Sequence, residues 1–374
     1  MKKNRTHLIP VSKPTIARSA RKYILDSLNS GWISVKGPNV EKFEKRFAEF
    51  VGTKYAVATS CGTSALHLSL ASLGIGKGNE VIVPALTMIA TVLPIIYQNA
   101  IPVLVDSEEF TGNIDLRKIE SRINIKTKAI VVVHLHGHPV DIDGVLKIAK
   151  KYNIPVIEDA AEAHGARYKN QIAGSLGTVG CFSFYGNKIV AIGEGGMITT
   201  NDKKIALLAK SLSNLARSPQ KHFLHTVIGF AYRMSNLQAS LGLAQLEEIT
   251  NNISRKREIA QKYNSLLKNI CYLELPIEKP YAKSVYWQYG ILLKKDSPVT
   301  RNQLEKILEK KGIETRRFFT PMHQQPALKK LGLFRDEHYP IAEDLSRRGL
   351  CLPSGLAIKN SEIKYVCNII NQVF

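Results

Sequence analysis

The sequence predicts an α/β protein, with a large domain on a mostly parallel central sheet and a smaller α+β domain after it. Apolar strand-like runs alternate with segments of helical spacing over residues 38–216. After residue 284 the pattern changes to a shorter mixture of both. A chain of 374 residues is long enough for about two domains. We therefore expect an N-terminal segment and large domain at residues 1–270 and a small domain at residues 271–374, with the junction near the proline-bearing stretch 275–283.

The elements of the large domain follow from apolar spacing. Residues 14–29 and 38–51 have helical spacing, and Val40, Phe43 and Phe47 share one face of the second helix. The loop GWISVKG separates the two. Strands and helices then alternate along the chain: strand 55–59, helix 60–74, strand 80–83, helix 88–97, strand 102–105, helix 115–122, strand 129–133, helix 142–152 and strand 155–157.

The remaining elements are predicted in the same way. A strand at 197–200 and a helix at 202–216 close the large domain, and a long helix runs from 227 to about 267. The small domain is expected to contain strand 286–293, helix 301–311, strand 313–316 and helices 341–349 and 361–373.

The chain is strongly basic, with a formal net charge of +21. Its lysines are scattered in pairs through nearly every predicted helix, and no basic arm or nucleic-acid-binding motif is present. This distribution favours solvated helix faces with a general preference for anionic ligands, and we expect no nucleic-acid partner.

Cysteine usage and hydropathy favour a cytoplasmic protein. The five cysteines are widely spaced and form no CxxC pair, so we expect reduced thiols and neither a disulfide framework nor a metal site. The 25 uncharged residues 81–105 contain three prolines, which fits strand, helix and strand in a core better than a membrane span. The basic start MKKNRTHLIP has no apolar run behind it, so it does not resemble a signal peptide.

The stretch CFSFYGNKIVAIGEGG, residues 181–196, places Lys188 between apolar residues and glycines. An amine held against apolar surface loses hydration of its charged form, so its pKa falls and it becomes a nucleophile toward carbonyls. The glycines allow tight turns or close approach to a planar ligand. A lysine in an ordinary surface turn is the alternative. Other segments of the chain distinguish a reactive lysine from a surface one.

Two further segments carry chemistry. In SCGTSALHLSLASLG a strand turns into a helix, and Gly62, Thr63 and Ser64 would leave free N–H groups at the helix start, which suits a phosphate; simple N-capping is the alternative. In IEDAAEAHGA, Asp159 follows an apolar strand at the edge where ligands gather, although it could also cap a helix. We interpret His164 as a structural histidine.

Together these segments describe pyridoxal 5'-phosphate (PLP) chemistry. The cofactor needs a lysine for its aldehyde, a carboxylate that keeps its ring nitrogen protonated, and a helix N-terminus for its phosphate. Lys188, Asp159 and the turn at Gly62 and Thr63 supply the three.

The sequence resembles the aspartate-aminotransferase-like, fold type I sugar-nucleotide aminotransferases of the DegT/DnrJ/StrS group. The resemblance covers nearly the whole chain and rests on these segments: GWIS (31–34), SCGTSALHLSL (60–70), EVIVPALTMIAT (80–91), EDAAEAHGA (158–166), CFSFYGNKIVAIGEGGMITT (181–200) and YRMSNLQASLGLAQLE (232–247).

The resemblance implies roles for individual residues. Lys188 would bind the PLP aldehyde and move the proton between the substrate carbon and the cofactor, and Asp159 would pair with the pyridine nitrogen. Glu162 would lie near the ring hydroxyl. The phosphate would be held by Gly62, Thr63 and Ser183, joined by Asn236 of a neighbouring subunit, so the site would span a homodimer interface.

The resemblance also marks a substrate pocket and one departure. Met88 stands where the group usually carries an aromatic residue stacked on the cofactor ring, and a thioether can still pack on a π face. Positions near the expected sugar-nucleotide pocket are Trp32, Tyr185, Arg316 and His323, for which ordinary packing is an alternative.

The segments SFYGNK, HTVIGFAYRMSN, SRKREIAQKYN, GIETRRFFTPMH and YPIAEDLSRRGLCLPS resemble the subgroup that aminates GDP-4-keto-6-deoxy-D-mannose with L-glutamate as donor. The implied context is bacterial polysaccharide assembly, such as lipopolysaccharide O-antigen. A UDP- or dTDP-linked 3- or 4-keto sugar remains an alternative substrate. A catalytically silent binding or regulatory module is a second alternative, which the three cofactor features disfavour. Related dehydratases carry histidine where Lys188 stands, which argues against dehydration.

Overall fold

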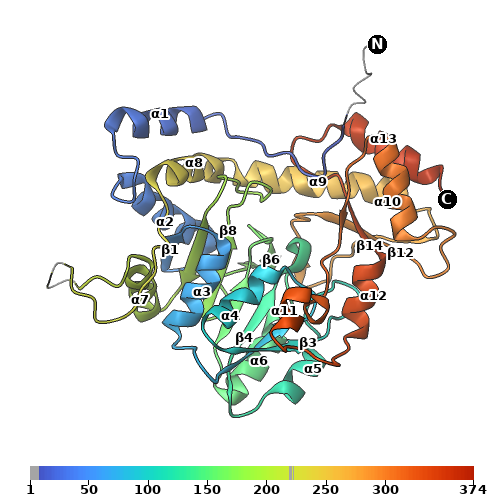
Figure 1. The fold of residues 1–374 in the computed structure, drawn as a ribbon. Coiled ribbons are helices and arrows are strands. Elements are labelled where there is room, and N and C mark those ends of the chain that lie inside the picture. The colour runs from blue at the N-terminus through green and yellow to red at the C-terminus, as the bar shows by residue number, and fades with distance from the viewer. Residues whose placement is uncertain (1–7, 219–220, 222) are drawn as a thin grey trace.

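A computed structural model describes residues 8–218, 221 and 223–374. Its centre is a seven-stranded sheet in the order β1-β9-β8-β5-β4-β2-β3. Only β9 runs against its neighbours, which confirms the mostly parallel sheet (Figure 1). The strands are β1 (Tyr55–Thr59), β2 (Glu80–Pro84), β3 (Ile101–Val105), β4 (Thr127–Val133), β5 (Val156–Asp159), β8 (Val179–Ser183) and β9 (Gly196–Thr200).

Helices cover both faces of this sheet because successive strand residues point to opposite sides. Cys181 of β8 packs into the core with α3 and α7, whereas its neighbour Phe182 packs against Phe47 of α2 with ring centroids 4.9 Å apart. The helices of this part are α1 (Ala20–Ser30), α2 (Pro38–Val51), α3 (Gly62–Ser72), α4 (Leu93–Tyr97), α5 (Leu116–Ile119), α6 (Ile142–Tyr152), α7 (Lys203–Ser213), α8 (Asn236–Glu247) and α9 (Ile249–Leu267).

A second, antiparallel sheet in the order β10-β12-β14-β13 forms the C-terminal part. Its elements are β10 (Leu273–Glu274), β12 (Tyr289–Leu293), β13 (Arg316–Arg317), β14 (Gly349–Leu352), α10 (Arg301–Lys310), α11 (Pro326–Lys330), α12 (Pro340–Arg348) and α13 (Asn360–Asn371). A small third sheet joins β11 (Ala282–Lys283), β6 (Arg167–Tyr168) and β7 (Gln171–Ile172).

Helix α9 connects the two main parts. Figure 1 shows it extending from α8 toward α10 and α13. Tyr263 and Leu267 of α9 belong to the core under the second sheet, although they precede residue 270. The domain boundary at 270 stays a prediction, and this packing indicates that the two domains would share α9.

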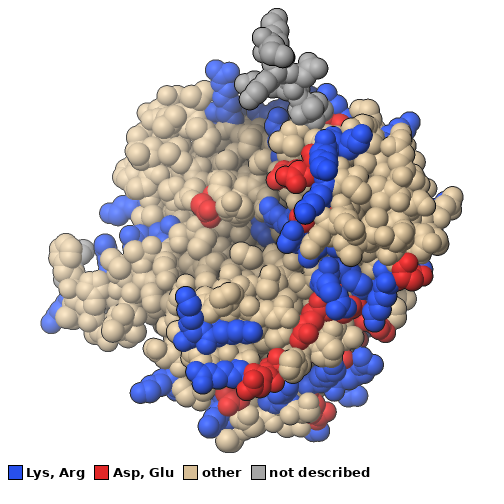
Figure 2. Space-filling model, turned by 45° about the vertical axis from the view of Figure 1, so that its right-hand side comes forward, with Lys and Arg blue, Asp and Glu red and all other residues tan. Residues whose placement is uncertain are grey.

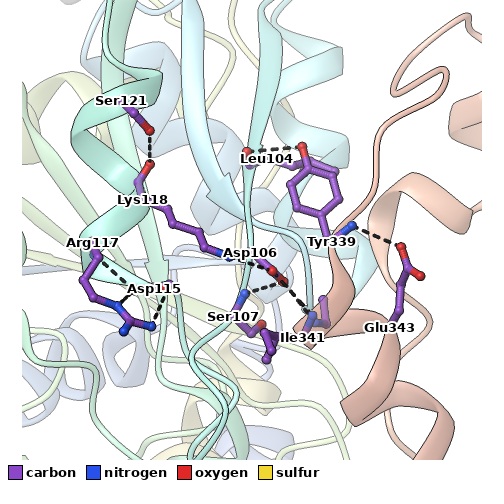
Figure 3. Close-up of polar contacts among 11 residues, drawn as sticks. Leu104, Asp106, Ser107, Asp115, Arg117, Lys118, Ser121, Tyr339, Ile341 and Glu343 are labelled. Carbon is purple, nitrogen blue, oxygen red and sulfur yellow. Dashed lines mark hydrogen bonds and ion pairs between the residues drawn. The ribbon is translucent and has the colours of Figure 1, made fainter.

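The carboxylate of Asp106, just after β3, fastens α12 to the central sheet (Figure 3). Its Oδ1 accepts a hydrogen bond from the backbone N–H of Ala342 (3.0 Å), and its Oδ2 accepts one from Lys118 Nζ (2.9 Å). The hydroxyl of Tyr339 donates to the carbonyl of Leu104 (3.3 Å). Because a carboxylate at a helix N-terminus is favourable, these contacts fix the C-terminal part against the edge of the sheet.

Some expected elements differ. The expected helix 88–97 is divided into a 3-10 turn (Ile89–Thr91) and α4, which begins beside Pro94. The long helix begins at Asn236 rather than 227, because Ser235 and Gln238 form a capping box there, and it is interrupted at Glu248. Strands β8 and β14 were not predicted, since their short apolar runs carry no clear period.

The surface agrees with scattered charge. Figure 2 shows Lys and Arg side chains spread over the visible face with Asp and Glu between them. Within the described ranges, no helix is long and apolar enough to cross a membrane, and no group of three or more His, Cys, Asp or Glu residues could hold a metal ion.

Candidate active site

A cavity of about 510 Å³ lies where β4, β5 and β8 end and α3 begins. This position is expected for a ligand site, because the carboxyl ends of parallel strands meet at one edge of the sheet. The lining residues are Cys61, Gly62, Thr63, Leu66, Thr87, Met88, Ala90, Thr91, Val133, Asp159, Ala161, Glu162, Ser183, Tyr185, Asn187, Lys188, Glu194, Trp287, Arg316 and Phe319.

Lys188 lies in the turn after β8, and its side chain is 11% exposed. Its Nζ lies 4.0 Å from Glu162 Oε1 and 3.8 Å from the centre of the Trp287 ring. Burial lowers the pKa of the Lys188 amine, and the nearby carboxylates of Glu162 and Asp159 oppose that shift. The cavity therefore contains a lysine that loses its proton more easily than an exposed lysine does, the direction that the sequence indicated.

Asp159 ends β5 and is 6% exposed. Its Oδ2 accepts a hydrogen bond from the Thr91 hydroxyl (2.8 Å), and its Oδ1 accepts one from the Ala161 N–H (3.2 Å). Burial raises the pKa of Asp159, while these hydrogen bonds and the charge of Lys188 lower it. No helix begins at Asp159, so the N-cap alternative does not hold. Each carboxylate oxygen can accept a further hydrogen bond, which suits a protonated ring nitrogen.

Glu162 lies between Lys188 and the backbone of His136. Its Oε2 accepts a hydrogen bond from the His136 N–H (2.7 Å). Burial raises the pKa of Glu162 to about 7, against the charge of Lys188 and this hydrogen bond. The side chain is therefore a carboxyl group that can exist in either protonation state near neutral pH.

The raised pKa of Glu162 makes stability depend on pH. A carboxyl whose pKa is 4.5 when unfolded and about 7 when folded stabilises the fold below pH 4.5, and that contribution is lost as pH rises through 7. In the cofactor-free chain, Glu162→Gln keeps an acceptor for His136 and should unfold at higher urea concentration than the parent at pH 8, but not at pH 4. The exposed Glu49→Gln is the control. Equal urea midpoints at pH 8 would contradict the shift. The charged groups facing Glu162 are Lys188, Asp159 and Arg316.

The start of α3 forms a cradle at one end of the cavity, beside Ser183. Cys61 caps the helix, and its Sγ accepts a hydrogen bond from the Ser64 N–H (3.4 Å), so the expectation of a free N–H at Ser64 is wrong. The N–H groups of Gly62 and Thr63 have no acceptor within the helix. Gly62 approaches Ser183 so closely that a Cβ on Gly62 would lie 2.7 Å from the Ser183 Cβ. Only glycine leaves room there, and Thr63 and Ser183 line the same cavity. A buried amine, a buried carboxylate and this cradle, in one cavity, fit PLP.

Other predicted residues reach the same cavity. Tyr185, Arg316 and Met88 all line it, and the Met88 and Tyr185 side chains are about half exposed. Their positions allow contacts with a cofactor or a substrate. His164 is buried against Phe47, Phe182 and Phe184, and burial lowers its pKa to about 3, as expected of a structural histidine.

Three predicted residues do not line the cavity. Asn236 is 1% exposed, and its amide is bonded within its own chain to Asn39, Ser27 and Trp32. Its amide hydrogen bonds are made within its own chain, and its contact with the phosphate of a neighbouring subunit stays a prediction. His323 is buried, and its Nε2 forms a hydrogen bond with Glu343 (2.9 Å). It therefore holds α12 in place and does not contact the cavity. Trp32 is 53% exposed on the loop after α1.

The sequence missed Thr91, Trp287 and Phe319, which also line the cavity. Thr91 could have been suspected, since it lies within EVIVPALTMIAT, one of the segments that carry the resemblance. Trp287 and Phe319 belong to the C-terminal part, and no local pattern shows which of its aromatic residues meets the large domain.

Comparisons agree with this geometry. The family described as the DegT/DnrJ/EryC1/StrS aminotransferase family matches residues 14–371. The chain is 42% identical to GDP-perosamine synthase of Escherichia coli O157:H7, covering 98% of both chains. It is 36% identical to dTDP-3-amino-3,6-dideoxy-alpha-D-galactopyranose transaminase of Aneurinibacillus thermoaerophilus, covering 92% of both. The fold is similar to the PLP form of a sugar aminotransferase from Streptococcus pneumoniae. The TM-score is 0.92 at 28% identity, covering 98% of this chain and 100% of that chain.

Proposed function

Because the chain belongs to the DegT/DnrJ/EryC1/StrS aminotransferase family, we propose that it transfers the amino group of L-glutamate to GDP-4-keto-6-deoxy-D-mannose and so forms GDP-perosamine. The chain is a PLP-dependent sugar-nucleotide aminotransferase with the α/β fold of that family. The observation that supports the proposal most is the buried Lys188 amine, which shares one cavity with Asp159 and the α3 cradle.

PLP, when bound, supplies an aldehyde for amines and a ring that accepts electrons as a proton leaves the neighbouring carbon. Lys188 would bind it and carry that proton, since a desolvated amine acts as both nucleophile and base. Asp159 would hold a proton on the ring nitrogen. The N-terminus of α3, with Thr63 and Ser183, would hold the phosphate. Glu162 would face the ring hydroxyl, and Met88 would pack on the ring.

The reaction would have two halves: glutamate first gives its amino group to the cofactor, and the keto sugar then receives it. Glutamate and the keto sugar would use the same Lys188 amine in turn, because the described cavity contains no second lysine. Arg316 and Tyr185 would contact the substrate, and the guanidinium of Arg316 suits a carboxylate or phosphate. Polysaccharide assembly would be the context of such a product.

The GDP-linked substrate is proposed because the chain is 42% and 40% identical to two GDP-perosamine synthases over 98% of its length. A dTDP- or UDP-linked 3- or 4-keto sugar is the second candidate, supported by the similarity to the dTDP-sugar transaminase.

A substrate panel separates these candidates. The purified chain should be assayed with glutamate and the GDP-, UDP- and dTDP-linked 4-keto-6-deoxy sugars side by side. We expect kcat/KM for the GDP sugar to exceed the others by about 100-fold, since one lost set of base contacts costs several kcal/mol. A higher kcat/KM for the dTDP or UDP sugar would contradict the GDP assignment and leave the family activity intact.

We also propose a homodimer with its active sites at the interface. Large apolar side chains are exposed on the loops after α7 and after α1, among them Leu224 (45%), Val227 (56%), Ile228 (89%) and Trp32 (53%). Large apolar side chains exposed within a few residues of each other on one loop, as at 224–228, are typical of an interaction site. Light scattering should give twice the chain mass of 41.6 kDa, and Ile228→Asp should reduce it. A monomer mass at micromolar concentration would contradict the dimer.

A further inference from the structure

A second buried lysine lies behind the first. Lys256 of α9 is 3% exposed, and both acceptors of its Nζ are backbone carbonyl oxygens, of Trp287 (2.8 Å) and of Ser354 (2.5 Å). Burial lowers the pKa of Lys256 to about 7. Burying an amine costs free energy unless its N–H groups are hydrogen-bonded. The two hydrogen bonds of Lys256 offset that cost, and they fix the position of the two carbonyl groups that accept them.

One of those carbonyls belongs to a residue of the active site. Trp287 is 5% exposed, and its indole N–H donates to the carbonyl of Asn187 (2.9 Å), the residue before Lys188. The face of its ring lies 3.8 Å from Lys188 Nζ. Trp287 therefore contacts both the backbone and the amine of the segment that carries Lys188.

The other carbonyl belongs to the loop after β14. Ser354 donates its backbone N–H to Val11, and its hydroxyl accepts from the N–H of Tyr289 in β12. The same loop is also held by α9 through Tyr263, whose hydroxyl donates to the carbonyl of Pro353 (2.7 Å). The loop thus has two anchors on α9, Lys256 and Tyr263, whereas Lys256 is the side chain that holds the Trp287 carbonyl.

We propose that Lys256 is a positioning residue: it fixes the Trp287 backbone so that the indole forms a wall against the Lys188 amine. The wall excludes water on one side of the amine and directs it toward the cavity. This inference rests on the proposed role of Lys188. It goes beyond that role, because it assigns a task to two residues that the reaction does not itself require.

The first test uses the full cofactor-free chain. The sequence contains two tryptophans, Trp32 and Trp287, so Trp32→Phe leaves Trp287 as the sole indole fluorophore. In that background Lys256→Met should shift the Trp287 emission to longer wavelength, because the unanchored indole gains water. Tyr263→Phe is the matched control: it removes one hydrogen bond from the same helix to the same loop and keeps its ring stacked on Tyr289. It should leave the emission unchanged.

The second test is a double-mutant cycle on the holoenzyme. Lys256→Met and Trp287→Leu should each lower kcat by about 10- to 100-fold, the effect of misplacing a reacting group by roughly 1 Å. KM for the sugar nucleotide should change less than kcat. Because both act through one contact, the double variant should fall no further than the more affected single variant. Tyr263→Phe should retain the parent kcat.

Additive losses in the cycle, or a Trp287 emission that Lys256→Met leaves in place, would overturn the proposal. If Lys256→Met does not fold, Lys256→Gln replaces it, since it keeps an amide donor at shorter reach and should give an intermediate emission shift; an unshifted emission would count equally against the proposal. Activity retained by Lys188→Ala would instead refute the proposed role of Lys188, and the emission test would still decide whether Lys256 holds the indole.

Discussion

Lys188→Ala should lower transamination by about 10⁴-fold or more, which makes it the most damaging single change we predict. The substitution removes both the amine that binds the cofactor and the base that moves the proton. The fold should survive, because the alanine leaves the neighbouring core residues Phe184 and Ile189 in place. The measurement is the rate of 2-oxoglutarate release from glutamate in the presence of the keto sugar, with circular dichroism to verify folding.

Lys147→Ala is the matched control, since Lys147 is exposed on α6 and does not line the cavity. It should leave the rate unchanged. A folded Lys188→Ala variant that transaminates within about tenfold of the parent would show that another group serves as the base.

Asp159→Asn should lower kcat by about 10²- to 10³-fold, the usual effect of removing one preorganised electrostatic partner from a reacting group. Asparagine has the same shape and can still accept from Thr91, but it carries no charge to sustain a proton on the cofactor ring. Cofactor binding should persist, because the α3 cradle and Lys188 are untouched. Single-turnover kinetics with glutamate should therefore show a slow chemical step and normal saturation.

Thr91→Val provides the comparison for Asp159. It removes the hydrogen bond to Asp159 Oδ2 and leaves the carboxylate in place. The loss of rate should be clearly smaller than that of Asp159→Asn. If the two variants lose rate equally, the hydrogen-bond geometry and not the charge of Asp159 would be the important property.

Lys188, Asp159 and Gly62 line one cavity, as the sequence led us to expect, while their roles toward PLP stay predictions. Asp159 ends a strand of the central sheet, Lys188 and Gly62 each follow another strand of it, and the ends of those strands meet at a common edge. A local interpretation of strand, turn and residue type therefore brings Asp159 and Gly62 to this edge, whereas β8, the strand before Lys188, was not predicted. The same logic gave β1 and α2 with the observed bounds.

The sequence is less informative where position depends on packing between distant segments. Asn236 lies in a segment that resembles the family, and within the chain its amide is hydrogen-bonded to Asn39, Ser27 and Trp32 of the N-terminal segment. His323 lies outside the cavity, where its Nε2 forms a hydrogen bond with Glu343 of α12. Trp287 enters the cavity only because the C-terminal part packs over the large domain. No spacing in the sequence encodes these three arrangements.

The most direct test of the account is to find the amine that carries the cofactor. The holoenzyme should be reduced with borohydride, which fixes PLP to its lysine, then digested and analysed by mass spectrometry. We predict that the added pyridoxyl phosphate mass lies on Lys188 and is absent from Lys256, the other buried lysine of this region. The mass on any other lysine, or on none, would contradict the account.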